Sequence, residues 1–206
     1  MSAARNTHPK RCDGHSVGVI ITDPVLGVLI GDISDGRGAS GVGGHVKDDF
    51  DGFDQAAHGE VNEETGLTVT SLNPLFPEPK WRANPCKRGD GPFGLGHKWQ
   101  LYRATVADVK ALRLDRKSFR NLRWVSEAQL QELAERTLRY ARGKITRGEW
   151  EERPGLTFSW VLWFVLAGMI EMPEAELQDD LLAHEVVAEV VGVVRVELHG
   201  GGHDVG

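Results

Sequence analysis

Residues 43–67 read Gly-Gly-His-Val-Lys-Asp-Asp-Phe-Asp-Gly-Phe-Asp-Gln-Ala-Ala-His-Gly-Glu-Val-Asn-Glu-Glu-Thr-Gly-Leu, and the expectations for the rest of the chain follow from this stretch. It predicts an acidic loop followed by a short helix. Asp51 or Gly52 suits the helix start, because a short acceptor side chain or a bare backbone is favoured at an N-cap. Gly66 suits the left-handed residue just after a helix end.

Three glutamates in this helix, Glu60, Glu63 and Glu64, have the spacing i, i+3, i+4. That spacing places their carboxylates on one side of the helix, where like charges repel. A divalent cation would remove the repulsion, and Mg²⁺ takes carboxylate oxygens together with water and substrate phosphates. The alternative is a solvated acidic helix face, which is common on surface helices.

Residues 60–67, preceded by Ala56-Ala57 and by Gly43-Gly44, closely resemble the signature of the Nudix hydrolases. That signature is Gly, five residues, Glu, seven residues, then Arg-Glu-apolar-x-Glu-Glu-x-Gly-apolar. The resemblance extends diffusely from about His15 to Ile170. It implies an α/β fold of the Nudix type, an α/β/α sandwich with a mixed β-sheet.

The resemblance also implies a reaction: metal-dependent hydrolysis of the pyrophosphate bond in a nucleoside diphosphate linked to another moiety. It implies Glu60, Glu63 and Glu64 as catalytic residues and as ligands of Mg²⁺ or Mn²⁺, one of them doubling as a base. The main-chain carbonyl of Gly44 is a further metal ligand in this interpretation. The expected partner is a small-molecule nucleoside diphosphate derivative.

The sequence departs from the family pattern in three places. Gly59 occupies the position of the arginine that positions a neighbouring glutamate, and we expect Gly59→Arg to raise the rate. The loop is one residue longer, and Asp51 replaces the first glutamate. Many relatives carry another acid just before a late strand; here the nearest is Asp115, interpreted as an ordinary surface aspartate. These departures keep a second hypothesis open, a catalytically weak or inactive Nudix-fold nucleotide sensor.

Composition sets further bounds. The 206 residues carry a net charge of −6, and residues 171–206 hold nine acidic side chains against Arg195 alone. The remainder is near neutral, which argues against a duplex nucleic-acid binder. The longest apolar run, residues 158–170, is too short to span a membrane. With no recognisable signal peptide, we expect a cytoplasmic protein with a flexible tail (1–14), one Nudix domain (15–171) and an acidic extension (172–206). An oligomer contact and a covering flap both stay open as roles for that extension.

Hydrophobic patterns predict the other elements of the domain. Strands are expected on both sides of a turn at Asp23-Pro24, and a glycine-dense loop over residues 35–44. Ser126 suits the cap of a helix. The remaining expectations are strands at 67–72, 97–106 and 119–125, a helix at 128–140, and a buried, tryptophan-rich closing helix within 156–170.

Residues 76–96 form a long segment with four prolines, interpreted as a loop because proline breaks regular elements. Loops of this length inside a compact domain are often functional. We expect Trp81 to stack on a base and Arg82, Lys87 and Arg88 to meet phosphate oxygens. The alternative is a solvent-exposed loop whose charges keep it hydrated.

Cys12, Cys86 and His97 raise the question of a zinc site. They contain no Cys-x-x-Cys pair, and three scattered ligands do not define a structural site by spacing. Reduced thiols are therefore expected, and no metal is assigned to them.

Overall fold

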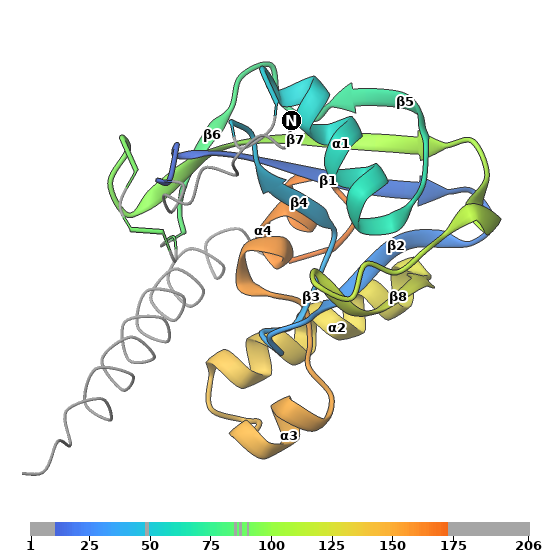
Figure 1. Ribbon diagram of the computed structural model, residues 1–206. Coiled ribbons are helices and arrows are strands. Elements are labelled where there is room, and N and C mark those ends of the chain that lie inside the picture. Colours follow the sequence, from blue (N-terminus) through green and yellow to red (C-terminus); the bar gives the residue numbers. More distant parts are fainter. Residues whose placement is uncertain (1–10, 48–49, 85, 87, 90, 173–206) are drawn as a thin grey trace, which may run out of the picture.

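The computed structural model describes residues 11–47, 50–84, 86, 88–89 and 91–172 (Figure 1). The expected acidic extension and most of the N-terminal tail lie outside these residues. The described chain forms a mixed β-sheet with helices on both sides. The strands are β1 (His15–Asp23), β2 (Gly27–Ile33), β3 (Ala39–Ser40), β4 (Val42–His45), β5 (Val69–Pro74), β6 (Lys80–Ala83), β7 (Gly96–Val106) and β8 (Phe119–Val125). The helices are α1 (Phe53–Thr65), the 3₁₀ turn η1 (Val109–Ala111), α2 (Glu127–Ala141), α3 (Arg147–Glu152) and α4 (Phe158–Leu166).

The sheet is organised around β1 and β7, which pair in parallel over residues 15–21 and 98–104. The strand order is β3-β2-β1-β7-β5, with β4 paired to β1, β6 to β7 and β8 to β2. All pairs other than β1 with β7 are antiparallel. Because β2 meets only the last residues of β1, the first half of β1 is free to pair with β4.

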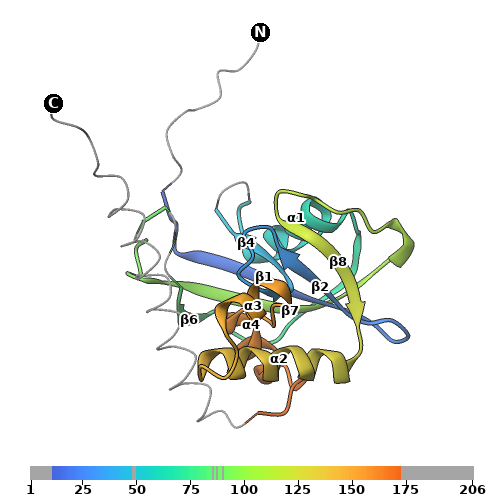
Figure 2. The same ribbon diagram turned by 90° about the horizontal axis from the view of Figure 1, so that it is seen from below.

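Alternating side chains of β1 build two cores, one on each face of the sheet. Val17, Val19 and Ile21 pack with Ala56 and Val61 of α1. Ile20 instead belongs to the cluster formed with α2 and α4, in which Trp163 and Phe164 are fully buried. Figure 2 shows the sheet between α1 and the pair α2 and α4, which confirms the expected α/β/α sandwich.

Several elements agree with the sequence-based expectations. The turn after β1 is held by Asp23 Oδ1, which accepts hydrogen bonds from the backbone N–H groups of Val25 and Leu26. Helix α2 begins with a capping box in which Ser126 and Gln129 satisfy each other's backbone N–H groups. The tryptophans of the apolar run are core residues, although α4 is shorter than the expected helix. No helix among the described residues is long and apolar enough to cross a membrane.

Two expectations about loops and one about the N-terminal boundary of the domain were wrong. The glycine-dense segment contains β3 and β4, since glycine lets β4 lie close against β1 and α1. The proline-rich segment contains β6, which fits between Pro79 and Pro85 and pairs with the start of β7. Packed structure also begins before the expected domain boundary, because Cys12 is buried and Asp13 accepts a hydrogen bond from the N–H of Lys47.

Candidate active site

Helix α1 presents its carboxylates to the glycine strand β4. Glu64 Oε2 accepts a hydrogen bond of 3.2 Å from the N–H of Gly43. The carboxylate of Glu60 lies against Gly44 so closely that a Cβ at residue 44 would be 1.9 Å from Glu60 Oε1. A side chain at residue 44 would therefore displace the Glu60 carboxylate from this position. Glu63, one turn from Glu60, is exposed to solvent.

The ends of α1 fix the direction of these side chains. The helix begins after Gly52 without a side-chain cap, and it ends at Gly66, which has the expected left-handed conformation with φ of 69°. Near the first turn, the Tyr102 hydroxyl of β7 donates a short hydrogen bond to Asp54. Ala56 and Ala57 are fully buried, so the helix backbone packs closely on the sheet.

Glu64 is buried, with 9% of its surface exposed. Burial, followed by repulsion from the nearby Glu60 carboxylate, raises the pKa of Glu64 to about 8, against smaller opposing effects of hydrogen bonds from Ser118 and Gly43. A carboxylate disfavoured in this way gains most from a bound cation. Carboxylate and backbone carbonyl oxygens are also the ligands that Mg²⁺ prefers. The donor set therefore fits a Mg²⁺-class ion.

Asp115 is not an ordinary surface aspartate. It is half-buried, its carboxylate accepts a hydrogen bond of 3.2 Å from Ser118 Oγ, and its charge contributes to the raised pKa of Glu64. Its backbone N–H donates to the carbonyl of Glu64. The segment before β8 thus brings a further acid to the carboxylate end of α1.

We expect the stability of the metal-free protein to fall as pH rises from about 4.5 towards 8. The pKa of Glu64 is raised by folding from 4.5 to about 8, so the fold favours the protonated side chain. That contribution is complete below the unfolded pKa and is lost as the pH rises through the folded pKa. Thermal unfolding between pH 4 and 9 would show the decline. Glu64→Gln should flatten it, and Mg²⁺ should oppose it at pH 8; an unchanged slope in Glu64→Gln would contradict the assignment.

The position of the expected arginine is filled by another side chain. A Cβ built at Gly59 would lie 2.1 Å from the ring of Phe50. The phenylalanine, from the loop that enters α1, therefore occupies the space in which a side chain at residue 59 would begin. This contact suits a glycine inside the helix, and on steric grounds we no longer expect Gly59→Arg alone to raise the rate.

A cavity of about 1070 Å³ extends from Glu64 and Gly43 across the open side of the sheet. Its walls come from the β2–β3 loop, the segment entering β8, and the region from α3 to α4. The volume is sufficient for a ligand of nucleotide size. The lining residues are Ile33, Ser34, Asp35, Gly36, Arg37, Ser40, Gly41, Gly43, Glu64, Asn84, Trp99, Lys117, Ser118, Phe119, Arg120, Tyr140, Arg147, Trp150, Glu151, Thr157, Phe158, Ser159 and Trp160.

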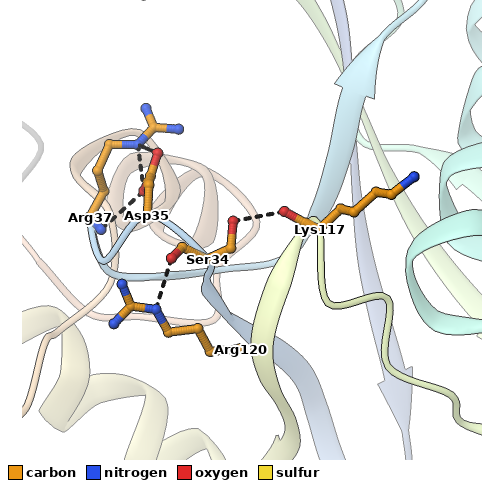
Figure 3. A network of polar contacts seen from close by, with 5 residues as sticks. All are labelled: Ser34, Asp35, Arg37, Lys117 and Arg120. Atoms are coloured by element: carbon orange, nitrogen blue, oxygen red, sulfur yellow. Dashed lines mark hydrogen bonds and ion pairs between the residues drawn. The ribbon is translucent and has the colours of Figure 1, made fainter.

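Cations from two loops meet at one edge of this cavity (Figure 3). Ser34 joins the loops: its Oγ donates to the carbonyl of Lys117 over 2.7 Å, and its own carbonyl accepts from Arg120 Nε over 2.8 Å. Arg37 forms an ion pair with Asp35 over 2.9 Å. The ammonium group of Lys117 points away from Ser34 in Figure 3. Lys117 lies near the carboxylate end of α1, because its backbone N–H donates to Asp115 Oδ1 over 3.2 Å.

The far wall of the cavity is aromatic. Tyr140 and Trp150 stack with ring centroids 4.5 Å apart and an angle of 19° between their planes. Phe158 and Trp160 also line the cavity, at the start of α4. Flat aromatic surfaces beside cations suit a ligand that has both a base and phosphates.

Of the expected substrate-binding residues of the 76–96 segment, the described ones, Trp81, Arg82 and Arg88, do not line this cavity. Arg82 lies with its guanidinium carbon 5.5 Å from the centre of the Trp163 ring. Trp81 is half exposed on β6 and donates a hydrogen bond to the carbonyl of Phe93. Arg88 is exposed on the following loop, and Lys87 lies outside the described residues. From this segment, Asn84 lines the cavity instead.

The sequence matches the NUDIX domain model over residues 14–147. The chain therefore belongs to the Nudix hydrolase family, whose members are generally metal-dependent pyrophosphohydrolases of nucleotide derivatives. No curated protein matches the sequence.

Solved structures of Nudix proteins also resemble the chain at low sequence identity. A Nudix-family hydrolase from Clostridium perfringens is 21% identical, with 58% of this chain and 85% of that chain covered and a TM-score of 0.45. The dihydroneopterin triphosphate pyrophosphohydrolase of E. coli is 16% identical (57% and 84% covered, TM-score 0.46). An Ap4A hydrolase of C. elegans is 18% identical (59% and 85% covered, TM-score 0.45).

Proposed function

We propose that this protein hydrolyses the pyrophosphate bond of a nucleoside diphosphate linked to another moiety, with Mg²⁺ or Mn²⁺ as cofactor. The observation that supports this proposal most strongly is the position of Glu64. Its buried carboxylate lies between the glycine strand and a large cavity with cationic and aromatic walls. A buried acid beside cations and flat rings suits a metal-bound diphosphate better than it suits a purely structural role.

Each part of the site has a role in this proposal. Glu60, Glu63 and Glu64, with the carbonyl of Gly44, would hold the cation, which withdraws charge from the diphosphate and lowers the pKa of a bound water. One carboxylate with an oxygen that does not bind the cation would accept the proton of the attacking water. Glu63 is the exposed one of the three and so the most accessible to solvent. Lys117 and Arg120 would orient the phosphates, and the aromatic wall would hold the base.

A substrate panel tests the proposal directly. The protein would be incubated with Mg²⁺ and nucleoside diphosphate sugars, dinucleoside polyphosphates, dinucleotides and nucleoside triphosphates, and the products separated by chromatography. We expect at least one compound to be cleaved into two phosphate-containing products, with loss of turnover in EDTA. Cleavage of none, although several compounds bind, would contradict hydrolysis.

The second candidate is a Nudix-fold module that binds a nucleotide without cleaving it. Gly59 favours this candidate, because Phe50 fills the space where the family has its arginine. In that case a compound of the panel should raise the melting temperature without being consumed. The same panel therefore separates the two candidates, provided that melting curves and product analysis are run on the same samples.

The cationic edge makes a separate prediction about substrate affinity. We expect Lys117→Ala to raise KM roughly tenfold or more with a smaller change in kcat, because a charge-assisted hydrogen bond contributes about 1.5–3 kcal/mol. Lys110→Ala on η1 is the matched control, since Lys110 is an exposed lysine outside the cavity lining. Equal KM values for the two variants would exclude Lys117 from substrate binding.

A further inference from the structure

A second group of metal-binding side chains lies where β1, β4 and β7 meet at one end of the sheet. The group consists of Cys12, His45, Cys86 and His97, and one ligand atom from each lies within 4.8 Å of the others. The strand pairing causes this convergence. Ser16 at the start of β1 pairs with His45 at the end of β4, and the parallel pairing of β1 with β7 brings His97 to the same end. Cys86 comes from the loop between β6 and β7.

The separations between these atoms agree with tetrahedral coordination. Cys12 Sγ lies 3.0 Å from His97 Nε2 and 3.9 Å from His45 Nε2, and Cys86 Sγ lies 3.4 Å from His45 Nε2. Zinc bonds of about 2.3 Å to sulfur and 2.0–2.1 Å to nitrogen place tetrahedral ligand atoms roughly 3.3–3.8 Å apart. The other separations are at most 4.8 Å, so the four atoms could surround one ion with shifts of about an ångström or less.

Backbone groups prepare both sulfur atoms for metal binding. Cys12 Sγ accepts from the N–H of Gly14, and Cys86 Sγ accepts from the N–H of Arg88, both over 3.4 Å. In each case the donor follows its cysteine by two residues. Metal binds cysteine as the thiolate, to which such N–H groups can also donate. They are also typical of the outer contacts that orient metal ligands.

We propose that Cys12, His45, Cys86 and His97 bind one structural Zn²⁺ ion. Two thiolates and two neutral imidazoles are a ligand set that zinc prefers, and they fill all four positions, which leaves none for a catalytic water. Binding would release the two thiol protons to solvent and leave a neutral centre. This site is distinct from the oxygen-ligand site of Glu60, Glu63 and Glu64, because thiolate and imidazole select zinc whereas carboxylates suit Mg²⁺.

The zinc site would stabilise the region around the active site. It would link the segment before β1 to the loop between β6 and β7, two segments that the sheet alone does not join. It would also fix the end of β4, because His45 directly follows Gly44, which lies against Glu60. Loss of zinc should therefore lower the melting temperature and reduce activity only in part.

Metal analysis of the full-length protein tests the proposal. After purification without chelator and dialysis, elemental analysis should find about one zinc per chain, as a four-ligand structural site requires. Cys86→Ser should lose most of it, because the substitution removes a thiolate ligand. Cys86 is the more accessible of the two thiols, so this change should disturb folding less than a change at Cys12. His58→Asn, at an exposed histidine of α1, should retain it. Equal zinc in wild type and Cys86→Ser would overturn the assignment.

A second measurement uses the wild-type protein and so needs no variant. Wild-type protein freed of zinc would be titrated with Co²⁺, and we expect the strong visible bands of tetrahedral cobalt together with thiolate-to-cobalt charge transfer in the near ultraviolet. Absence of both bands would overturn the proposal. So would an intact mass two hydrogens below the reduced value before any reductant is added, because it would show a disulfide between Cys12 and Cys86.

Discussion

Replacing Glu63 or Glu60 by glutamine is expected to lower kcat/KM by roughly three orders of magnitude, with little loss of folding stability. Glutamine keeps the size of the side chain and removes the charge that holds the cation. A cation that polarises a phosphoryl group contributes several kcal/mol to the transition state, and each 1.4 kcal/mol is about a factor of ten in rate. Both side chains are at least partly accessible, so the substitution leaves no buried unpaired amide group in the core.

Glu132→Gln is the matched control for this prediction. Glu132 is an exposed glutamate of α2, on the opposite face of the sheet from α1. Steady-state rates should be measured over a range of Mg²⁺ concentrations, together with isothermal titration of Mg²⁺ into each variant. If Glu63→Gln and Glu132→Gln had the same rate, the glutamates of α1 would not be the catalytic ligands in this protein.

The second large effect concerns Gly59 and Phe50. We expect Gly59→Arg alone to lower the melting temperature and the rate, because its Cβ would meet the Phe50 ring at 2.1 Å. Forcing extra atoms into a packed region typically costs about 1–3 kcal/mol. The double variant Phe50→Ala with Gly59→Arg should recover most of that loss, because the removed ring leaves space for the arginine stem.

A double-mutant cycle measures this coupling. Unfolding free energies of wild type, the two single variants and the double variant should give a favourable interaction energy of about 1–3 kcal/mol between the two substitutions. Rates measured on the same four proteins would show whether an arginine at residue 59 aids catalysis once it fits. Additive effects on stability would mean that the loop moves away and that Phe50 does not determine the choice of glycine.

The sequence was most informative where the determinants of structure are local. The spacing of Glu60, Glu63 and Glu64, the helix stop at Gly66 and the cap at Ser126 depend on residues a few positions apart. The strands at both ends of the Asp23 turn could be predicted for the same reason. The glycine at residue 44 was also singled out from the sequence, and the structure places it against Glu60.

The features that sequence patterns missed depend on pairing between distant segments. Strand β4 exists because its glycines fit beside β1, and periodicity cannot show this. The cations of the cavity were sought near Arg82, although Lys117 and Arg120 line the cavity together with Glu64. Arg37 and the basic residues before β8 were visible in the sequence, but nothing local indicated that their loops meet. The sequence likewise gave no spacing that could join His45 to the two cysteines.

The parallel pairing of β1 with β7 has a consequence for how the chain acquires its structure. Residues that pair between these two strands, such as Val17 and Gln100, are more than 80 positions apart in the chain. Pairings of such long range form late, because the intervening polypeptide must first lose its freedom. Tyr102, which anchors the start of α1, lies on the later strand. During synthesis, helix α1 should therefore lack this hydrogen bond until β7 has left the ribosome, and chains released before that point should be substrates for chaperones and proteases.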